Sequence, residues 1–98
     1  MPNYPLYQTQ TVTAASPAQV GATGTRTLRA VILFGGSAAS QVEFKNAATD
    51  TGTVLLSLNC AAGATTGVDL TSLGGLSFST AIYCKPAGTG AICYVWYD

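Results

Sequence analysis

The sequence predicts an all-β fold, a small antiparallel β-sandwich or barrel of jelly-roll-like form with about seven strands. Apolar and polar residues alternate with a period of two along most of the chain, whereas helical periodicity is weak. Turn signals rich in Gly, Pro, Asp and Ser recur at intervals of roughly eight to twelve residues. The 98 residues suffice for one domain with its own core. The expected strands cover residues 9–13, 25–34, 41–46, 53–59, 67–70, 77–85 and 91–97.

The segment 25–34 is expected to be a central or covered strand. One of its faces carries Leu28, Ala30, Ile32 and Phe34, and the other face begins polar and turns apolar at Val31 and Leu33. Strands that are apolar on both faces are usually covered on both sides. The next two segments, 41–46 and 53–59, are separated by a turn cluster and predict a hairpin.

The last two segments, 77–85 and 91–97, predict a second hairpin, closed by the turn at 86–90. The first segment places Phe78, Thr80, Ile82 and Cys84 on one face. In the last segment, Ile92, Tyr94 and Trp96 oppose Cys93, Val95 and Tyr97. We expect Trp96 to fill the core and Tyr97, next to the terminus, to lie at the surface or in an interface. The alternative for Trp96 is an exposed ring that stacks on sugars or forms an interface hot spot.

The three cysteines, Cys60, Cys84 and Cys93, are odd in number and lack CxxC spacing, which argues against a thiolate metal site. Cys84 and Cys93 flank the second predicted hairpin. A loop with an even number of residues places them opposite each other, within reach of a disulfide, and an odd loop turns them to opposite faces. We expect free thiols, because unpaired Cys behaves as a small buried hydrophobe.

The composition excludes several functions. The chain has no His, so it lacks a Ser-His-Asp or Cys-His nucleophile and a His-containing zinc site. Four Lys and Arg residues are too few to neutralise a run of phosphates, so no nucleic-acid partner is expected. The four acids are scattered and match neither a carboxylate pair nor a calcium loop: Glu43, Asp50, Asp69 and Asp98. We therefore expect no enzyme, no cofactor, no metal and no small-molecule substrate.

The net charge of zero favours a protein that works while docked on something else, with a weakly charged monomer from a salty environment as the alternative. Charged residues make up 8% of the chain, and 47 of the 98 residues are Ala, Thr, Gly or Ser. Soluble proteins that act alone usually keep their net charge away from zero. The start of the chain lacks the pattern of a signal peptide, and no apolar run is long enough to span a membrane, so synthesis in the cytoplasm and no membrane partner are expected.

We expect residues 1–7 to form an extended arm and residues 8–98 to form a single β-sandwich domain. Tyr4, Leu6 and Tyr7 are costly to leave in water, which favours packing on the chain's own sheet or on a neighbour over a disordered tail. Arg26 and Arg29 open the long apolar strand. They are candidates for salt bridges to a partner or to a neighbouring subunit, with a solvated pair as the alternative.

Four segments carry a resemblance to a known group of proteins: residues 4–13 (YPLYQTQTVT), 55–58 (LLSL), 61–66 (AAGATT) and 74–83 (GGLSFSTAIY). In these segments the chain resembles small β-rich virion structural proteins of tailed, cyanophage-like bacteriophages. Some proteins of this group are capsid decoration, or cement, proteins. The motifs are patterns of strands and turns and contain no catalytic signature.

The resemblance implies a protein on the capsid surface that stabilises contacts between capsid subunits. Its expected partners are the major capsid protein and other copies of itself, with a trimer at a capsid three-fold axis as one arrangement by analogy. Tyr4, Leu6, Tyr7, Arg26, Arg29 and Tyr97 are the candidate partner-interface residues. The alternative function is a carbohydrate-binding or host-adsorption module on a tail or fibre, motivated by the cluster of Tyr and Trp at the C-terminus.

Overall fold

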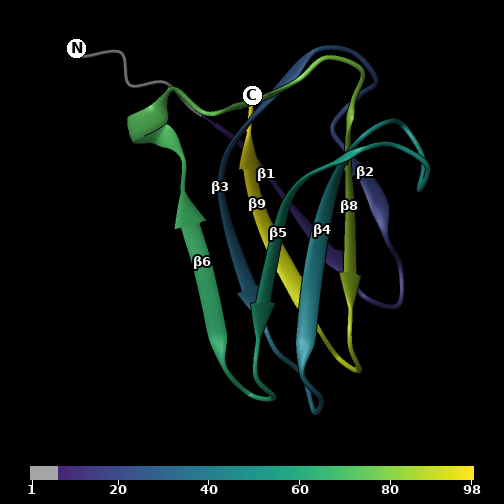
Figure 1. The fold of residues 1–98 in the computed structure, drawn as a ribbon, viewed down its shortest axis with the longest axis vertical. Coiled ribbons are helices and arrows are strands. Elements are labelled where there is room, and N and C mark those ends of the chain that lie inside the picture. The colour runs from purple at the N-terminus through teal and green to yellow at the C-terminus, as the bar shows by residue number, and fades with distance from the viewer. Residues whose placement is uncertain (1–6) are drawn as a thin grey trace.

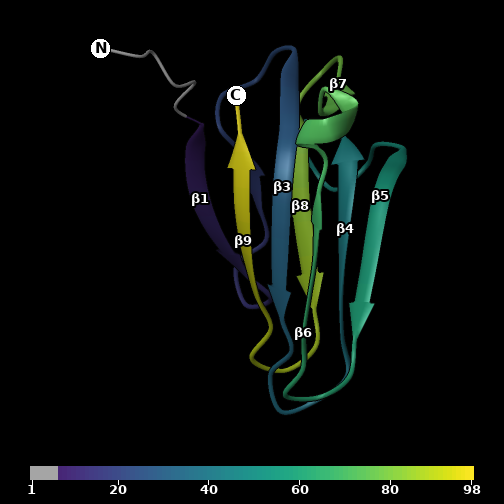
Figure 2. The same cartoon turned by 90° about the vertical axis from the view of Figure 1, so that its left-hand side faces the viewer.

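The computed structural model describes residues 7–98 and confirms the all-β prediction. In this part of the chain, nine strands form two antiparallel sheets that pack face to face as a small β-sandwich (Figures 1 and 2). Tyr4, Leu6 and all of the expected arm except Tyr7 lie outside the described residues. Within residues 7–98, no helix is long and apolar enough to cross a membrane.

Sheet A contains the C-terminal strand and the long strand predicted over 25–34. Its strand order is β1 (Gln8–Thr13), β9 (Ile92–Tyr97), β3 (Arg26–Phe34) and β6 (Thr65–Asp69). A short strand, β7 (Leu76–Phe78), pairs with the beginning of β3. Because β3 has neighbours on both sides, the expectation that it is a central strand is confirmed.

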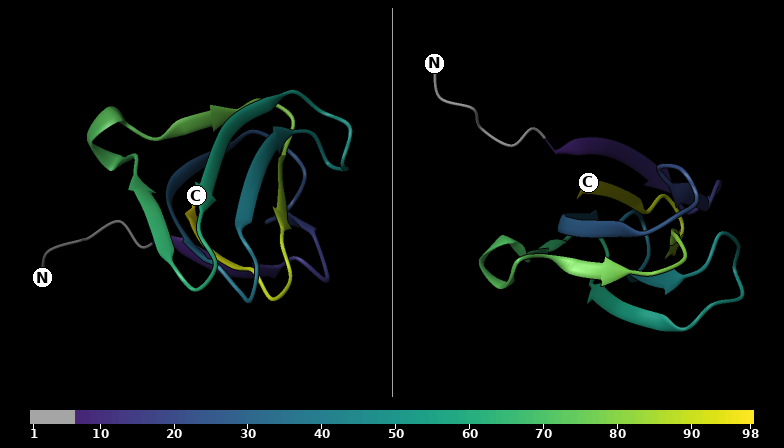
Figure 3. Two further views of the ribbon diagram at one scale, coloured as in Figure 1. Left: turned by 60° about the horizontal axis from the view of Figure 1, so that its bottom comes forward. Right: turned by 90° about the horizontal axis from the view of Figure 1, so that it is seen from above.

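Sheet B contains the predicted hairpin of the middle of the chain. Its strand order is β2 (Ala18–Val20), β8 (Ile82–Ala87), β4 (Ser40–Asn46) and β5 (Val54–Cys60). β4 and β5 pair as expected for the segments 41–46 and 53–59. Views along the other directions separate the two layers (Figure 3).

The core lies between the sheets and is built from the inward-facing half of each strand. Sheet A contributes Val12, Leu28, Val31, Leu33, Cys93, Val95 and Tyr97, and sheet B contributes Val20, Val42, Phe44, Ile82 and Cys84. Phe78 of β7 is also fully buried. Burial of a large apolar side chain contributes about 1.5–3 kcal/mol, so this shared core holds the two layers together.

A β-bulge in β3 corrects the predicted faces of that strand. Leu28 pairs with Tyr97 and Ala30 pairs with Trp96, so Arg29 is an extra residue on one side of the ladder. A bulge shifts the alternation by one residue. Before it Leu28 points inward, and after it Val31 and Leu33 do. Ala30, Ile32 and Phe34 therefore lie on the outer face and do not share a face with Leu28.

The prediction of one strand over 77–85 was wrong, because the chain changes sheets within it. β7 belongs to sheet A and β8 to sheet B. The crossing is fixed by Asn46, whose Oδ1 accepts a hydrogen bond from the Thr80 N–H at 2.9 Å, while the Thr80 carbonyl accepts one from the Gly24 N–H at 2.8 Å.

The prediction of a second hairpin was also wrong. β8 lies in sheet B and β9 in sheet A, so the turn at 86–90 connects the two layers instead of two paired strands. This turn is tight. A Cβ at Gly88, where φ is +111°, would lie 2.7 Å from Ser40 Oγ. Only glycine tolerates both this backbone conformation and this close approach.

Candidate functional site

The outer face of sheet A carries a band of mostly aromatic, aliphatic and hydroxyl side chains. The band is ordered by the registers of β1, β9, β3 and β6, which form three rows across the sheet. From β1 to β6 these rows are Thr9–Trp96–Ala30–Asp69, Thr11–Tyr94–Ile32–Gly67 and Thr13–Ile92–Phe34–Thr65. Phe34 is 43% exposed and Tyr94 37%, and their rings meet edge to face with centroids 5.3 Å apart.

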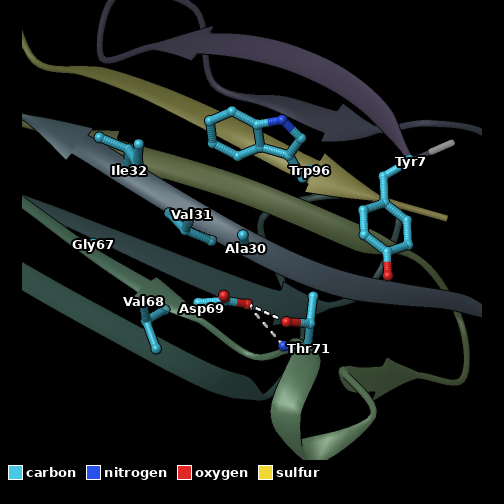
Figure 4. A pocket seen from close by; sticks show the side chains of 9 residues that line it. All are labelled: Tyr7, Ala30, Val31, Ile32, Gly67, Val68, Asp69, Thr71 and Trp96. Carbon is cyan, nitrogen blue, oxygen red and sulfur yellow. Dashed lines mark hydrogen bonds between the residues drawn. The ribbon is translucent and has the colours of Figure 1, made fainter. Parts of the chain in front are cut away.

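A hollow of about 470 Å³ opens in this face, and we call it the Trp96 hollow (Figure 4). Trp96 forms one wall, and Ala30 and Gly67 leave the space beside it empty because their side chains are minimal. Asp69 and Thr71 stand on the opposite side, and Tyr7 closes one end. The volume falls within the range of about 300–1,000 Å³ that is typical of small-ligand sites.

Asp69 is the ionisable group of the Trp96 hollow. Its Oδ1 accepts hydrogen bonds from the Thr71 N–H at 2.9 Å and from the Thr71 hydroxyl at 2.6 Å. These two bonds hold the pKa of Asp69 below its usual value. The carboxylate is therefore charged at neutral pH. No hydrogen bond from residues 7–98 reaches its Oδ2.

Trp96 and Tyr97 exchange the positions that the sequence predicted for them. Trp96 does not fill the core: its ring lies half-buried on the outer face of sheet A (Figure 4). Tyr97 is not at the surface, being only 6% exposed, and its hydroxyl donates a hydrogen bond to Gln8 Oε1 at 3.2 Å. Both faces of the last strand are apolar, so the alternation alone did not decide which face is buried.

The structure brings Tyr7, Arg29 and the chain's last residue together at one end of the sandwich. The Arg29 guanidinium lies 5.2 Å from the centre of the Tyr7 ring. It also donates to Asp98 Oδ2 at 2.6 and 3.1 Å and to the Gly74 carbonyl at 3.0 Å. Arg29 thus forms its salt bridge within the chain. Arg26, at the start of the same strand, donates to the Ala22 carbonyl at 3.0 Å.

The outer face of sheet B is polar and carries a group of three charges. Asp50 lies between Lys45 and Lys85, with 2.6 Å from Lys85 Nζ to Asp50 Oδ2. Hydrogen bonds from both lysines lower the pKa of Asp50, and the bond to Asp50 raises the pKa of Lys85. Glu43 is paired with Lys85 across the strands. The two outer faces of the molecule therefore differ: sheet B carries this charged group, whereas sheet A carries the aromatic band with the Asp69 carboxylate on its edge strand β6.

All three cysteines are free thiols, as expected. Cys84 and Cys93 are fully buried and come from different sheets. The neighbouring Cys93 sulfur and burial both raise the pKa of the Cys84 thiol, so it stays protonated. Residues 7–98 contain no group of three or more His, Cys, Asp or Glu placed to hold a metal ion.

Comparisons with known proteins place the chain in no family. No family model matches it, and no curated protein sequence does. A solved structure to which it is similar is that of a Bacillus endospore appendage, described as one of a family of disulfide-linked pili. The two share 13% sequence identity over 94% of this chain and 85% of the other, with a TM-score of 0.48.

Proposed function

We propose that this chain is a structural virion protein of a tailed bacteriophage, of the capsid decoration type. In this role it binds the outside of the head and stabilises contacts between capsid subunits. The observation that carries the proposal is the end of the sandwich where Tyr7, Arg29 and Asp98 meet. Two of the predicted partner-contact residues, Tyr7 and Arg29, meet there.

The way in which the chain uses its charges supports the same function. Asp98 is bound by Arg29, Asp50 by two lysines and Asp69 by Thr71, all within the chain. What remains on the surface is largely neutral and rich in hydroxyl groups. A protein present in many copies on a symmetric particle needs only weak individual contacts, because the effective concentration of neighbouring sites is high.

Binding to stripped phage heads tests the role of the N-terminal segment. The variant lacking residues 2–7 should fold, because β1, the first strand within the described residues, begins at Gln8, but it should no longer bind to heads from which the protein has been removed. Ser57→Ala, on the outer face of sheet B, is the matched control and should bind as the unaltered chain does. Cosedimentation measures binding, and circular dichroism measures folding.

Two outcomes would count against this account. If the deleted chain binds heads normally, docking does not use the N-terminal segment. If the deleted chain fails to fold, the segment belongs to the core of the domain and is not an interface.

A further inference from the structure

We propose that the Trp96 hollow binds a neutral saccharide. The site combines an outward-facing indole, a small side chain beside it and a carboxylate with one oxygen free to accept a hydrogen bond. These three groups lie in one row of sheet A: Trp96, Ala30 and Asp69. Figure 4 shows the indole and the carboxylate on opposite sides of the space over β3. This site stands on its own observations and does not depend on the proposed place in the virion.

The indole supplies a stacking surface. The face of an aromatic ring carries partial negative charge, and the C–H groups on one face of a pyranose ring carry partial positive charge, so the two attract each other. Ala30 lies directly beside Trp96 on the neighbouring strand. Because a methyl group is all that stands there, the side of the indole toward β6 stays accessible to a ligand.

The opposite side supplies hydrogen bonds. The Trp96 and Asp69 positions are two strand spacings apart, or about 10 Å. Oδ1 of Asp69 is occupied by Thr71, which fixes the carboxylate and leaves Oδ2 as an acceptor for a sugar hydroxyl.

The charges around the hollow favour a neutral ligand. Asp69 is ionised and repels carboxylates, sulfates and phosphates. The nearest cation, Arg29, is neutralised by Asp98 at 2.6 Å. A purely apolar ligand would remove water from Oδ2 of Asp69 without replacing the lost hydrogen bond, which is unfavourable. A neutral sugar avoids the repulsion by Asp69 and offers hydroxyl groups to its carboxylate, while one face of the sugar ring is apolar enough to stack on the indole.

Trp96 itself reports on the site, because it is the only Trp of the chain. The purified full chain is titrated with neutral saccharides, namely glucose, galactose, mannose and N-acetylglucosamine and their short oligomers, and with sialyllactose as the acidic counterpart. We expect a saturable change in Trp fluorescence with at least one neutral saccharide and none with sialyllactose. Asp69→Asn should weaken binding roughly tenfold, the loss of one charge-assisted hydrogen bond.

Blocking the floor separates the site from general folding effects. Ala30→Leu keeps the indole but fills the space beside it, so it should abolish the fluorescence change while the chain stays folded and still binds phage heads. Tyr83→Ala, on the outer face of sheet B, is the control and should bind saccharide normally. Calorimetry repeats each titration independently of the fluorescence.

Three results would overturn the proposal. They are the absence of a saturable signal with every neutral saccharide, equal binding of sialyllactose, and unchanged binding in Ala30→Leu. A change in Trp fluorescence that follows protein concentration instead of saccharide would assign the hollow to a second copy of the chain.

Discussion

Among single residues, Arg29 holds together three segments at one end of the sandwich. It is the extra residue of the β3 bulge, and a bulge turns a side chain out of the regular alternation. Its guanidinium then reaches Asp98, the Gly74 carbonyl and the Tyr7 ring at the same time. One residue thereby connects Asp98, which follows β9, with the turn before β7 and the first described residue.

Arg29→Ala should lower the free energy of unfolding by about 1 kcal/mol, because a half-exposed ion pair with added hydrogen bonds is worth roughly that much. Arg29→Lys should recover part of the loss, since it keeps the charge but not the planar fork. Arg26→Ala removes a single bond to a carbonyl and serves as the smaller control. Urea denaturation measures all three. Equal effects of Arg29→Ala and Arg26→Ala would contradict the connecting role.

Asp50 makes stability depend on pH in the acid range. Its folded-state pKa lies below the ordinary value of 3.8, so the unfolded chain binds the proton more tightly. The stabilisation is therefore present above pH 3.8 and is lost as the pH falls through the lower folded-state value. In Asp50→Asn this part of the acid destabilisation should be missing in denaturation curves measured from neutral to acid pH. A parallel decline of both proteins would contradict it.

At the scale of elements, the sequence predicted strands better than it predicted their faces. Val42 and Phe44 point inward as expected, because polar residues fill the other face of their strand. β3 and β9 are apolar on both faces, so alternation has no preferred side. In β3 the bulge at Arg29 determines which side chains point into the core. In β9 the pairing of Tyr97 with Leu28 turns Tyr97 inward and Trp96 outward. This decision comes from tertiary contacts that no local pattern contains.

The sheet change between β7 and β8 has a similar cause. Ser79 and Thr80 suit an exposed strand position as well as a crossing between layers. The hydrogen bonds that fix the crossing come from Asn46 and Gly24, which are distant in sequence. The Trp96 hollow likewise depends on tertiary structure, because the side chain of Ala30 points outward only as a result of the bulge in β3.

The cysteines test the arrangement of β8 and β9 in opposite layers. In the native protein only Cys60, which is half-buried, should react with a thiol reagent, and all three should react after unfolding. The buried Cys84 thiol should stay inert because its pKa is raised. The intact mass should correspond to the fully reduced chain. Rapid native labelling of Cys84 or Cys93 would contradict the buried placement of that thiol, and a mass lower by two hydrogen atoms would contradict the free thiols.

At the scale of the whole molecule, the two outer faces differ in a way that composition could not predict. The net charge of zero says nothing about where the charges lie. The structure places Lys45 and Lys85 on sheet B, with Asp50 bound to both from the β4–β5 connection, and leaves the aromatic band on sheet A without charge at its centre. This asymmetry gives the molecule a solvated side and a side suited to recognition.

The proposed capsid decoration role is tested most directly by quantitative mass spectrometry of purified particles of the virus in which we propose that this chain occurs. Decoration of the capsid would give a copy number comparable to that of the major capsid protein, and the protein would stay with the heads when tails are removed and be lost when loosely bound proteins are stripped. A low copy number that follows the tails would contradict decoration of the capsid. It would instead place the protein on a tail or fibre, where the Trp96 hollow would serve adsorption to the host.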